Sequence, residues 1–219
     1  MKSSTLLLST NPIRLFSIII IWMFHLSAII GTMLGHLDWF IVKTPLNLMI
    51  LSVLLGINFP LNSIKKLLVS FLFFSFGIAI EWVGVHYDFV FGSYSYAQNL
   101  GTKIDGVPLL IGINWAMLIL ICGAISDKLA NSFVVKIILG AAFMVLLDFF
   151  IEVPAPQLGF WVFEGGTAPL RNYLAWFLIS AALLSVYHKQ KIKGDFIFSC
   201  HLYAAQLVFF AFFYVRNSL

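Results

Sequence analysis

Seven long stretches of predominantly apolar residues alternate with short polar segments along the chain. They lie near residues 14–34, 44–60, 67–87, 107–126, 133–153, 172–188 and 196–214. A membrane-spanning helix needs about 20 such residues, with a range of about 17–25. The second stretch is the weakest, because it is short and ends at Asn58 and Pro60. The pattern predicts an all-α fold, a polytopic transmembrane helical bundle of about seven spans.

The composition supports a membrane protein. Of the 219 residues, 61% are hydrophobic and 10% are charged. Soluble domains are about 45–50% apolar and about 25% charged, so a soluble, disordered or nucleic-acid-binding protein is excluded. Cys122 and Cys200 lie inside apolar stretches, which excludes a disulfide framework and a CxxC zinc site. The first stretch is too long for a signal peptide, and we expect residues 1–219 to form a single integral membrane domain.

The basic residues predict how the bundle is oriented. Nine of them fall on one side of the predicted spans: Lys2, Arg14, Lys65, Lys66, Lys128, Lys136, Lys189, Lys191 and Lys193. The other side holds four: Lys43, Lys103, Arg171 and Arg216. Because basic loops tend to stay in the cytoplasm, the N-terminus is predicted to be cytoplasmic and the C-terminus to lie on the far side, in a bacterial plasma membrane.

Two loops differ from the others in length and composition. Residues 88–106 read DFVFGSYSYAQNLGTKIDG, and residues 154–171 read PAPQLGFWVFEGGTAPLR. Both are glycine-rich and aromatic, and both fall on the predicted non-cytoplasmic side. Functional residues tend to gather in long structured loops on a rigid scaffold, so we expect the site at that end of the bundle.

Four acidic residues lie within the apolar stretches or at the end of one, close to those loops: Glu81, Asp88, Asp148 and Glu152. A charge in a span costs roughly 2.5–3.5 kcal/mol on insertion scales, so such residues are functional by default. Asp148 and Glu152 are four residues apart and share a helix face. Carboxyl groups that meet without a lysine or arginine tend to retain protons, which a general acid requires. We therefore predict these four residues to be catalytic, although Glu152 could instead be solvated at the interface and Asp88 could be structural.

Small residues accompany the first two acids. Gly77, Glu81, Gly84 and Asp88 are spaced by 4, 3 and 4 residues, so they form one stripe along a helix. Glycines on such a stripe allow another helix, or a ligand, to approach closely.

Aromatic and amide side chains gather near the acids. The predicted substrate-binding residues are Trp82, Tyr94, Tyr96, Asn114, Trp115, Trp161, Asn172, Tyr173 and Trp176. Tryptophan and tyrosine form interfacial belts in any membrane protein, so it is their coincidence with the acids that favours a site. Aromatic faces stabilise cations. The five histidines are scattered and no nucleotide motif is present, so we expect neither a metal ion nor a cofactor.

Two segments carry a family resemblance. The segment EWVGVHYDFVFGSYSYAQNLGTKIDGVPLLIGINWAML, followed by LDFFIEVPAPQLGFWVFEGGTAPLRNYLAWF, resembles the integral membrane carotenoid hydratase family. That family includes γ-carotene 1′-hydratases and archaeal bisanhydrobacterioruberin hydratases, and the resemblance covers roughly residues 77–177. One departure is that Val153 separates Glu152 from Pro154, where the family pattern has proline directly after the glutamate.

The resemblance implies cofactor-free addition of water to the terminal C1=C2 double bond of an acyclic carotenoid, giving a tertiary hydroxyl. The substrate would reach the protein from the membrane lipids, and we expect association with other enzymes of carotenoid biosynthesis. The residues agree with this chemistry, because a buried acid can protonate C2 while aromatic faces hold the positive charge at C1. We assign the proton donor to Asp148 or Glu81 and the positioning of water to Glu152 or Asp88.

Two alternatives remain open from the sequence. A carotenoid or prenyl cyclase would use the same protonation but exclude water. A proton-coupled transporter of a small solute would use intramembrane acids as a relay, but it should place them at the midplane and show half-repeats.

Overall fold

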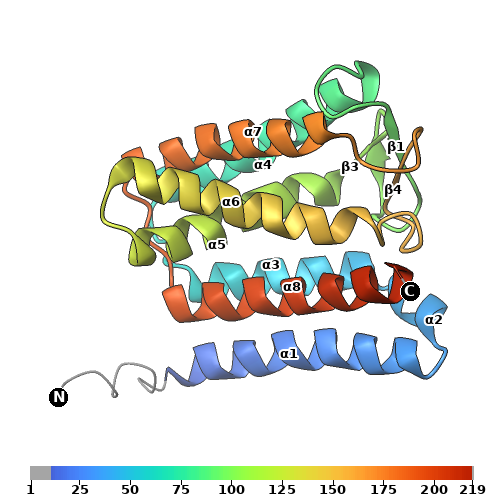
Figure 1. Cartoon of the computed structure of the whole chain (residues 1–219). Coiled ribbons are helices and arrows are strands. Elements are labelled where there is room, and N and C mark those ends of the chain that lie inside the picture. Colours follow the sequence, from blue (N-terminus) through green and yellow to red (C-terminus); the bar gives the residue numbers. More distant parts are fainter. Residues whose placement is uncertain (1–10, 219) are drawn as a thin grey trace.

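Each predicted apolar stretch forms a helix in the computed structural model, which describes residues 11–218 (Figure 1). The helices that correspond to the stretches are α1 (Pro12–Met33), α3 (Thr44–Asn58), α4 (Ile64–His86), α5 (Leu109–Leu129), α6 (Phe133–Glu152), α7 (Leu170–Lys189) and α8 (Phe196–Ser218). A short helix, α2 (Leu37–Ile41), joins α1 to α3. The predicted all-α helical bundle is confirmed. Lys2, which contributed to the predicted orientation, lies outside the described residues.

The helix α3 is shorter than a full membrane span. Within residues 11–218, six helices are long and apolar enough to cross a membrane. The remaining apolar helix, α3, has 15 residues, fewer than the lower limit of about 17 for a span. It ends because Phe59 is extended, the conformation that a following proline favours. The structure therefore gives six full spans and one shorter helix in place of the seven spans predicted.

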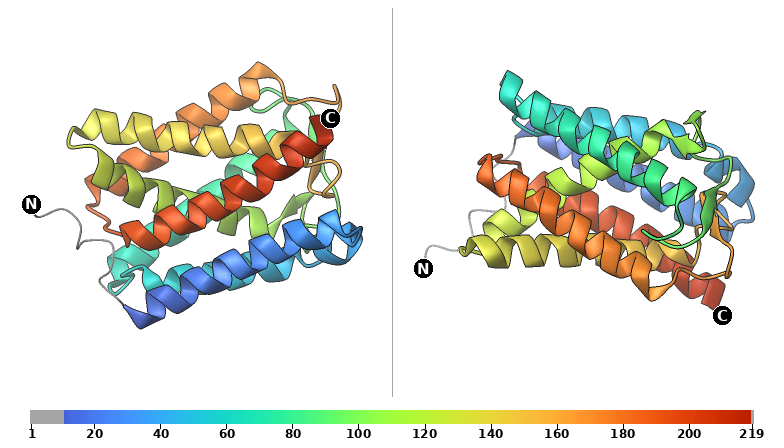
Figure 2. Two further views of the ribbon diagram at one scale, coloured as in Figure 1. Left: turned by 60° about the horizontal axis from the view of Figure 1, so that its bottom comes forward. Right: turned by 90° about the horizontal axis from the view of Figure 1, so that it is seen from above.

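The long helices lie side by side in alternating directions. The described chain begins at one end of the bundle with α1 and finishes at the other end with α8 (Figure 2). Helix α5 is central and packs against α3, α4, α6, α7 and α8. Its buried residues extend from Ile111 to Ser126 on all of its faces, as expected for a helix that is apolar all round.

The two long loops meet at one end of the bundle and pair with each other (Figure 1). The strands at this end are β1 (Tyr94–Tyr96), β2 (Lys103–Ile104), β3 (Val107–Pro108) and β4 (Trp161–Phe163). Strand β1 pairs antiparallel with β4, which places Tyr96 opposite Trp161. Strands β2 and β3 form a hairpin whose turn residues, Asp105 and Gly106, have positive φ, as a type I′ turn requires. The prediction that both loops lie at the same end is confirmed.

The opposite end of the bundle carries ion pairs made by residues that we predicted to be cytoplasmic. Asp127 binds Lys136 at 2.5 Å and Lys193 at 2.6 Å, between the α5–α6 and α7–α8 connections. Arg14, in the first turn of α1, binds Asp195 at 3.0 Å. These contacts hold the start of α1 and the two connections together, away from the paired loops.

Candidate active site

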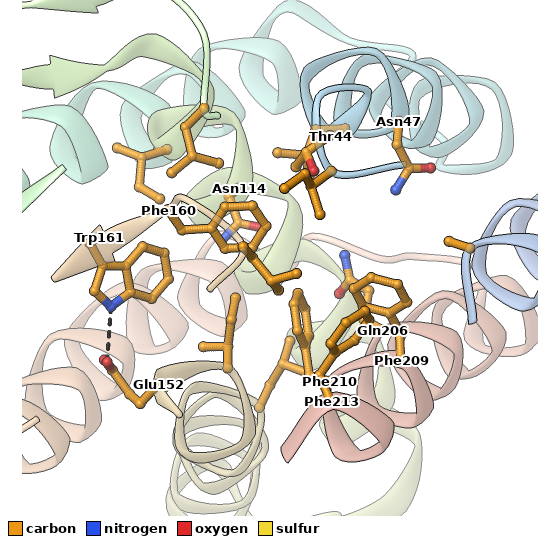
Figure 3. Close-up of a pocket in the computed structure, with 18 of the residues that line it drawn as sticks. Thr44, Asn47, Asn114, Glu152, Phe160, Trp161, Gln206, Phe209, Phe210 and Phe213 are labelled. Carbon is orange, nitrogen blue, oxygen red and sulfur yellow. Dashed lines mark hydrogen bonds between the residues drawn. The ribbon is translucent and has the colours of Figure 1, made fainter. Parts of the chain in front are cut away.

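A cavity of about 330 Å³ lies among the helices and reaches the paired loops. Its walls are mainly aromatic and aliphatic (Figure 3). Glu81 from α4, Asp148 and Glu152 from α6, and Asn172 from α7 line it together. All four residues are buried, with between 1% and 9% of their surface exposed. The structure therefore brings together three of the four predicted acids.

Glu81 accepts hydrogen bonds on both of its carboxyl oxygens. Tyr94 and Tyr96 donate to Oε2 at 2.5 and 2.7 Å, and Trp115 Nε1 donates to Oε1 at 2.8 Å. Strand β1 presents both tyrosines to Glu81, because alternate residues of a strand point to the same side. This arrangement of donors suits a carboxylate, which can only accept.

The two tyrosines stay protonated over a wide pH range. Burial is the main cause that raises the pKa of Tyr94 and Tyr96 above the usual value, and the negative charge of Glu81 adds to it. Their rings also pack edge to face, with 5.6 Å between the centroids. Because both phenols remain donors, their hydrogen bonds to Glu81 are expected to persist at neutral and alkaline pH.

Asp148 and Glu152 form a pair of carboxyl groups, one helical turn apart on α6. Asn172 Nδ2 donates to Asp148 Oδ2 at 2.9 Å and to Glu152 Oε1 at 3.0 Å. Trp161 Nε1 donates to Glu152 Oε2 at 2.9 Å (Figure 3). One nitrogen, Asn172 Nδ2, thus lies within hydrogen-bond distance of both carboxyl groups, and two carboxyl groups held this close favour retention of a proton by one of them. Glu152 points inward, so Val153 does not turn it away from the site.

Two tryptophans stack beside Glu81. The rings of Trp115 and Trp176 are 4.1 Å apart at their centroids and within 10° of parallel. Trp176 lines the cavity and Trp115 is fully buried behind it. A Cβ atom at Gly77 would lie 2.6 Å from Trp115 Cβ, so only glycine allows α4 and α5 to come this close. The close approach predicted for the glycines is confirmed at Gly77 and also at Gly84, where a Cβ atom would overlap Phe91 and Tyr94; Asp88 lies beyond the end of α4 and is not part of the stripe.

The structure sorts the predicted substrate-binding residues into two groups. Those that line the cavity are Tyr94, Tyr96, Asn114, Trp161, Asn172 and Trp176. Four other predicted site residues do not line it, and one of them, Trp115, is buried behind Trp176. Asp88 follows the end of α4 and is exposed. Trp82 faces outward and donates to Asp105 at 2.7 Å. Tyr173 is half-buried and packs against Phe149.

Several lining residues were not predicted from the sequence. They include aromatic side chains of α8 and three polar residues, Thr32 from α1, Asn47 from α3 and Gln206 from α8. The available signal was a polar residue inside an apolar stretch, which applies to all three. Among residues 11–218, histidine, cysteine and acidic side chains form no group of three that could hold a metal ion.

The long apolar helices define an integral membrane protein, and its cavity holds a cluster of buried carboxyl groups. Residues 39–218 match the family described as carotenoid biosynthesis protein. The chain therefore belongs to the carotenoid biosynthesis protein family. The predicted resemblance to carotenoid hydratases is confirmed by this match and by the relative described next.

A bisanhydrobacterioruberin hydratase from Haloarcula japonica is 27% identical to the chain over 124 residues. The match covers 51% of this chain and 40% of that relative, so the chain spans less than half of the relative's length. No solved structure matches the chain.

Proposed function

We propose that the protein adds water to the terminal C1=C2 double bond of an acyclic carotenoid end group without a cofactor. The observation that carries this proposal is the meeting of Glu81, Asp148 and Glu152 in an aromatic cavity. In the described part of the chain, uncharged tyrosine, tryptophan and asparagine side chains donate hydrogen bonds to these groups. Family membership and the name of the Haloarcula japonica relative support a hydratase.

The Asp148–Glu152 pair is suited to supply the proton. Two carboxyl groups that share the amide of Asn172 favour retention of a proton inside the cavity, where it can be given to C2 of the double bond. The positive charge then develops on C1, which becomes a tertiary cation. The oxygen of a water molecule bonds to C1, and the proton that this water loses returns to the carboxyl pair. The net change is one added water, and the pair regains its original proton.

Glu81 is suited to stabilise the cation rather than to protonate the substrate. Its oxygens are occupied as acceptors by Tyr94, Tyr96 and Trp115, so its negative charge is fixed in place before the reaction. Preorganised charge and dipoles near a developing charge are effective in a cavity that excludes bulk water. The stacked face of Trp176 contributes in the same sense.

The protein is proposed to lie in a bacterial plasma membrane with its N-terminus in the cytoplasm. The site would then sit toward the outer leaflet, where the end group of a long polyene reaches interfacial water. Association with other enzymes of carotenoid biosynthesis belongs to the same proposal, because each substrate and product stays in the lipid.

Expression in a host that makes lycopene tests the reaction. We expect new pigments that are heavier than lycopene by the mass of one or two waters and more polar on chromatography. A host that expresses Asp148→Asn at the same level in the membrane is the matched control. Recovery of unchanged lycopene with both proteins would contradict hydration of this end group. Cyclic products of unchanged mass would favour the cyclase alternative.

A further inference from the structure

A second group of polar side chains lines the same cavity, on helices other than those that carry the three carboxyl groups. Thr32, Asn47 and Gln206 come from α1, α3 and α8, whereas the acids come from α4 and α6. Figure 3 shows Asn47 and Gln206 projecting from different helices into the cavity. Thr32 and Gln206 are 1% and 4% exposed.

Each of these residues has a buried oxygen without a hydrogen-bond partner among the described residues. The atoms are Thr32 Oγ1, Asn47 Oδ1 and Gln206 Oε1. Buried polar atoms are nearly always paired with protein or with a bound molecule, because an unmade hydrogen bond is costly. Three such atoms on the wall of one cavity therefore indicate that polar groups bind along this part of the wall.

The atoms restrict what such a group is. Amide oxygens only accept hydrogen bonds, so the bound group must donate. The hydroxyl of Thr32 can either donate or accept. A water molecule has two O–H groups and can donate to both amide oxygens, whereas an alcohol hydroxyl can donate to one amide oxygen and accept from Thr32.

We propose that Thr32, Asn47 and Gln206 form a second polar subsite that binds a hydroxyl group. This inference rests on the proposed function, which needs water and an apolar polyene in one cavity. The hydroxyl belongs either to a water molecule kept for the reaction or to an alcohol group on the substrate. In the first case the subsite supplies the water that attacks C1. In the second case it anchors a polyene that already carries an oxygen.

Isotope exchange separates water supply from proton donation. In heavy water the carboxyl pair donates a deuteron to C2 of lycopene. If water then adds, the product is a deuterated alcohol. If water does not add, a proton is lost from carbon next to the cation, the double bond re-forms, and deuterium remains in the recovered lycopene. The ratio of exchange to hydration therefore reports how well the cation is supplied with water.

The test compares Gln206→Leu and Thr32→Val with the wild-type protein in isolated membranes, using lycopene as the probe. If the subsite holds water, hydration falls about fivefold for each lost hydrogen bond, while deuterium exchange is retained, so their ratio rises. Thr32→Ser keeps the hydroxyl and should restore the wild-type ratio. Ser180→Ala is the matched control, because Ser180 Oγ is also buried and unpartnered but does not line the cavity.

A second arm identifies an alcohol of the substrate. The probe is a synthetic acyclic polyene with one hydroxyl near the reacting end, compared with its deoxy counterpart. If the subsite binds that hydroxyl, both variants raise the KM of the hydroxylated probe about fivefold and leave lycopene unaffected. If neither the exchange ratio nor the KM changes, the subsite proposal is wrong. If the wild-type protein shows neither exchange nor hydration, the proposed function fails instead.

Discussion

Glu81, Asp148 and Glu152 are all buried carboxyl groups, yet their hydrogen bonds give them different chemistry. Glu81 accepts from two phenols and an indole, so both of its oxygens are occupied. Asp148 accepts from Asn172 through Oδ2, and the same amide nitrogen donates to Glu152. We therefore propose Asp148, paired with Glu152, as the proton donor in preference to Glu81, the other donor that the sequence left open.

Replacement of Asp148 by asparagine tests this assignment. The amide keeps the size of the side chain and the contact with Asn172 but has no acidic proton to give. We expect Asp148→Asn to insert into the membrane and to lower alcohol formation by about 10²–10⁴-fold, the usual contribution of general acid catalysis. Product yield per amount of membrane protein is the measurement. Asp88→Asn, the same change at an exposed site outside the cavity, should be neutral; equal losses in both variants would contradict the assignment.

The two tyrosines that donate hydrogen bonds to Glu81 give a second prediction. Tyr96→Phe keeps the ring that packs against Trp161 and removes one hydrogen bond to Glu81. Because hydrogen bonds to charged groups contribute about 1.5–3 kcal/mol, we expect hydration to fall about tenfold or more. The rate of alcohol formation at saturating lycopene measures the effect. Tyr87→Phe, at an exposed tyrosine, should retain full activity.

Helical geometry explains which site residues could be predicted from the sequence. Glu81 was identifiable because a charge in a span is rare. Trp82 could have been excluded, since the next residue on a helix points about 100° away from its neighbour. Asp88 could not, because α4 ends at His86 and Tyr87 is extended, so the helical spacing that placed Asp88 on the stripe no longer applies.

At the scale of elements, the close approach of α4 and α5 positions the site. Gly77 lies against Trp115, whose indole reaches Glu81. The paired strands β1 and β4 then close the site by placing Tyr96 and Trp161 side by side. The sequence predicted that the two loops share one end, but strands of three residues are too short for a period-two pattern to reveal their pairing.

Gly77→Ala tests the helix contact. The added methyl group would overlap Trp115, and overpacking of this kind costs about 1–3 kcal/mol. We expect a lower midpoint of thermal unfolding in detergent and a loss of hydration, because α5 and the indole must move away from Glu81. Gly56→Ala is the matched control, since a Cβ atom there meets nothing within 4 Å. That change should be neutral or stabilising; a similar destabilisation in both variants would show that the contact with Trp115 is not the cause.

For the whole molecule, the sequence predicted the helical bundle but not the full extent of its cavity. Glu81, Asp148 and Glu152 could be assigned to one end of the bundle, because each lies near the same end of its predicted span. The remaining wall, built by α1, α3 and α8, depends on which helices become neighbours, and apolar stretches that are hydrophobic on all sides carry little information about that. Asn58 and Pro60, at the end of the second apolar stretch, indicated that α3 would be short.

The orientation of the bundle gives the last prediction. Asp127, Lys136 and Lys193 gather at the end opposite the paired loops, and most of the basic residues flank the spans at this same end. If these residues hold that end in the cytoplasm, alkaline phosphatase fused after Arg216 should be active outside the cytoplasm. The same reporter fused after Lys191 should be inactive, and a fusion after Ser132 serves as a second cytoplasmic control. The opposite pattern would move the carboxyl group site to the cytoplasmic leaflet, because the site lies at the same end of the bundle as Arg216, and the polyene end group would then have to react on that side.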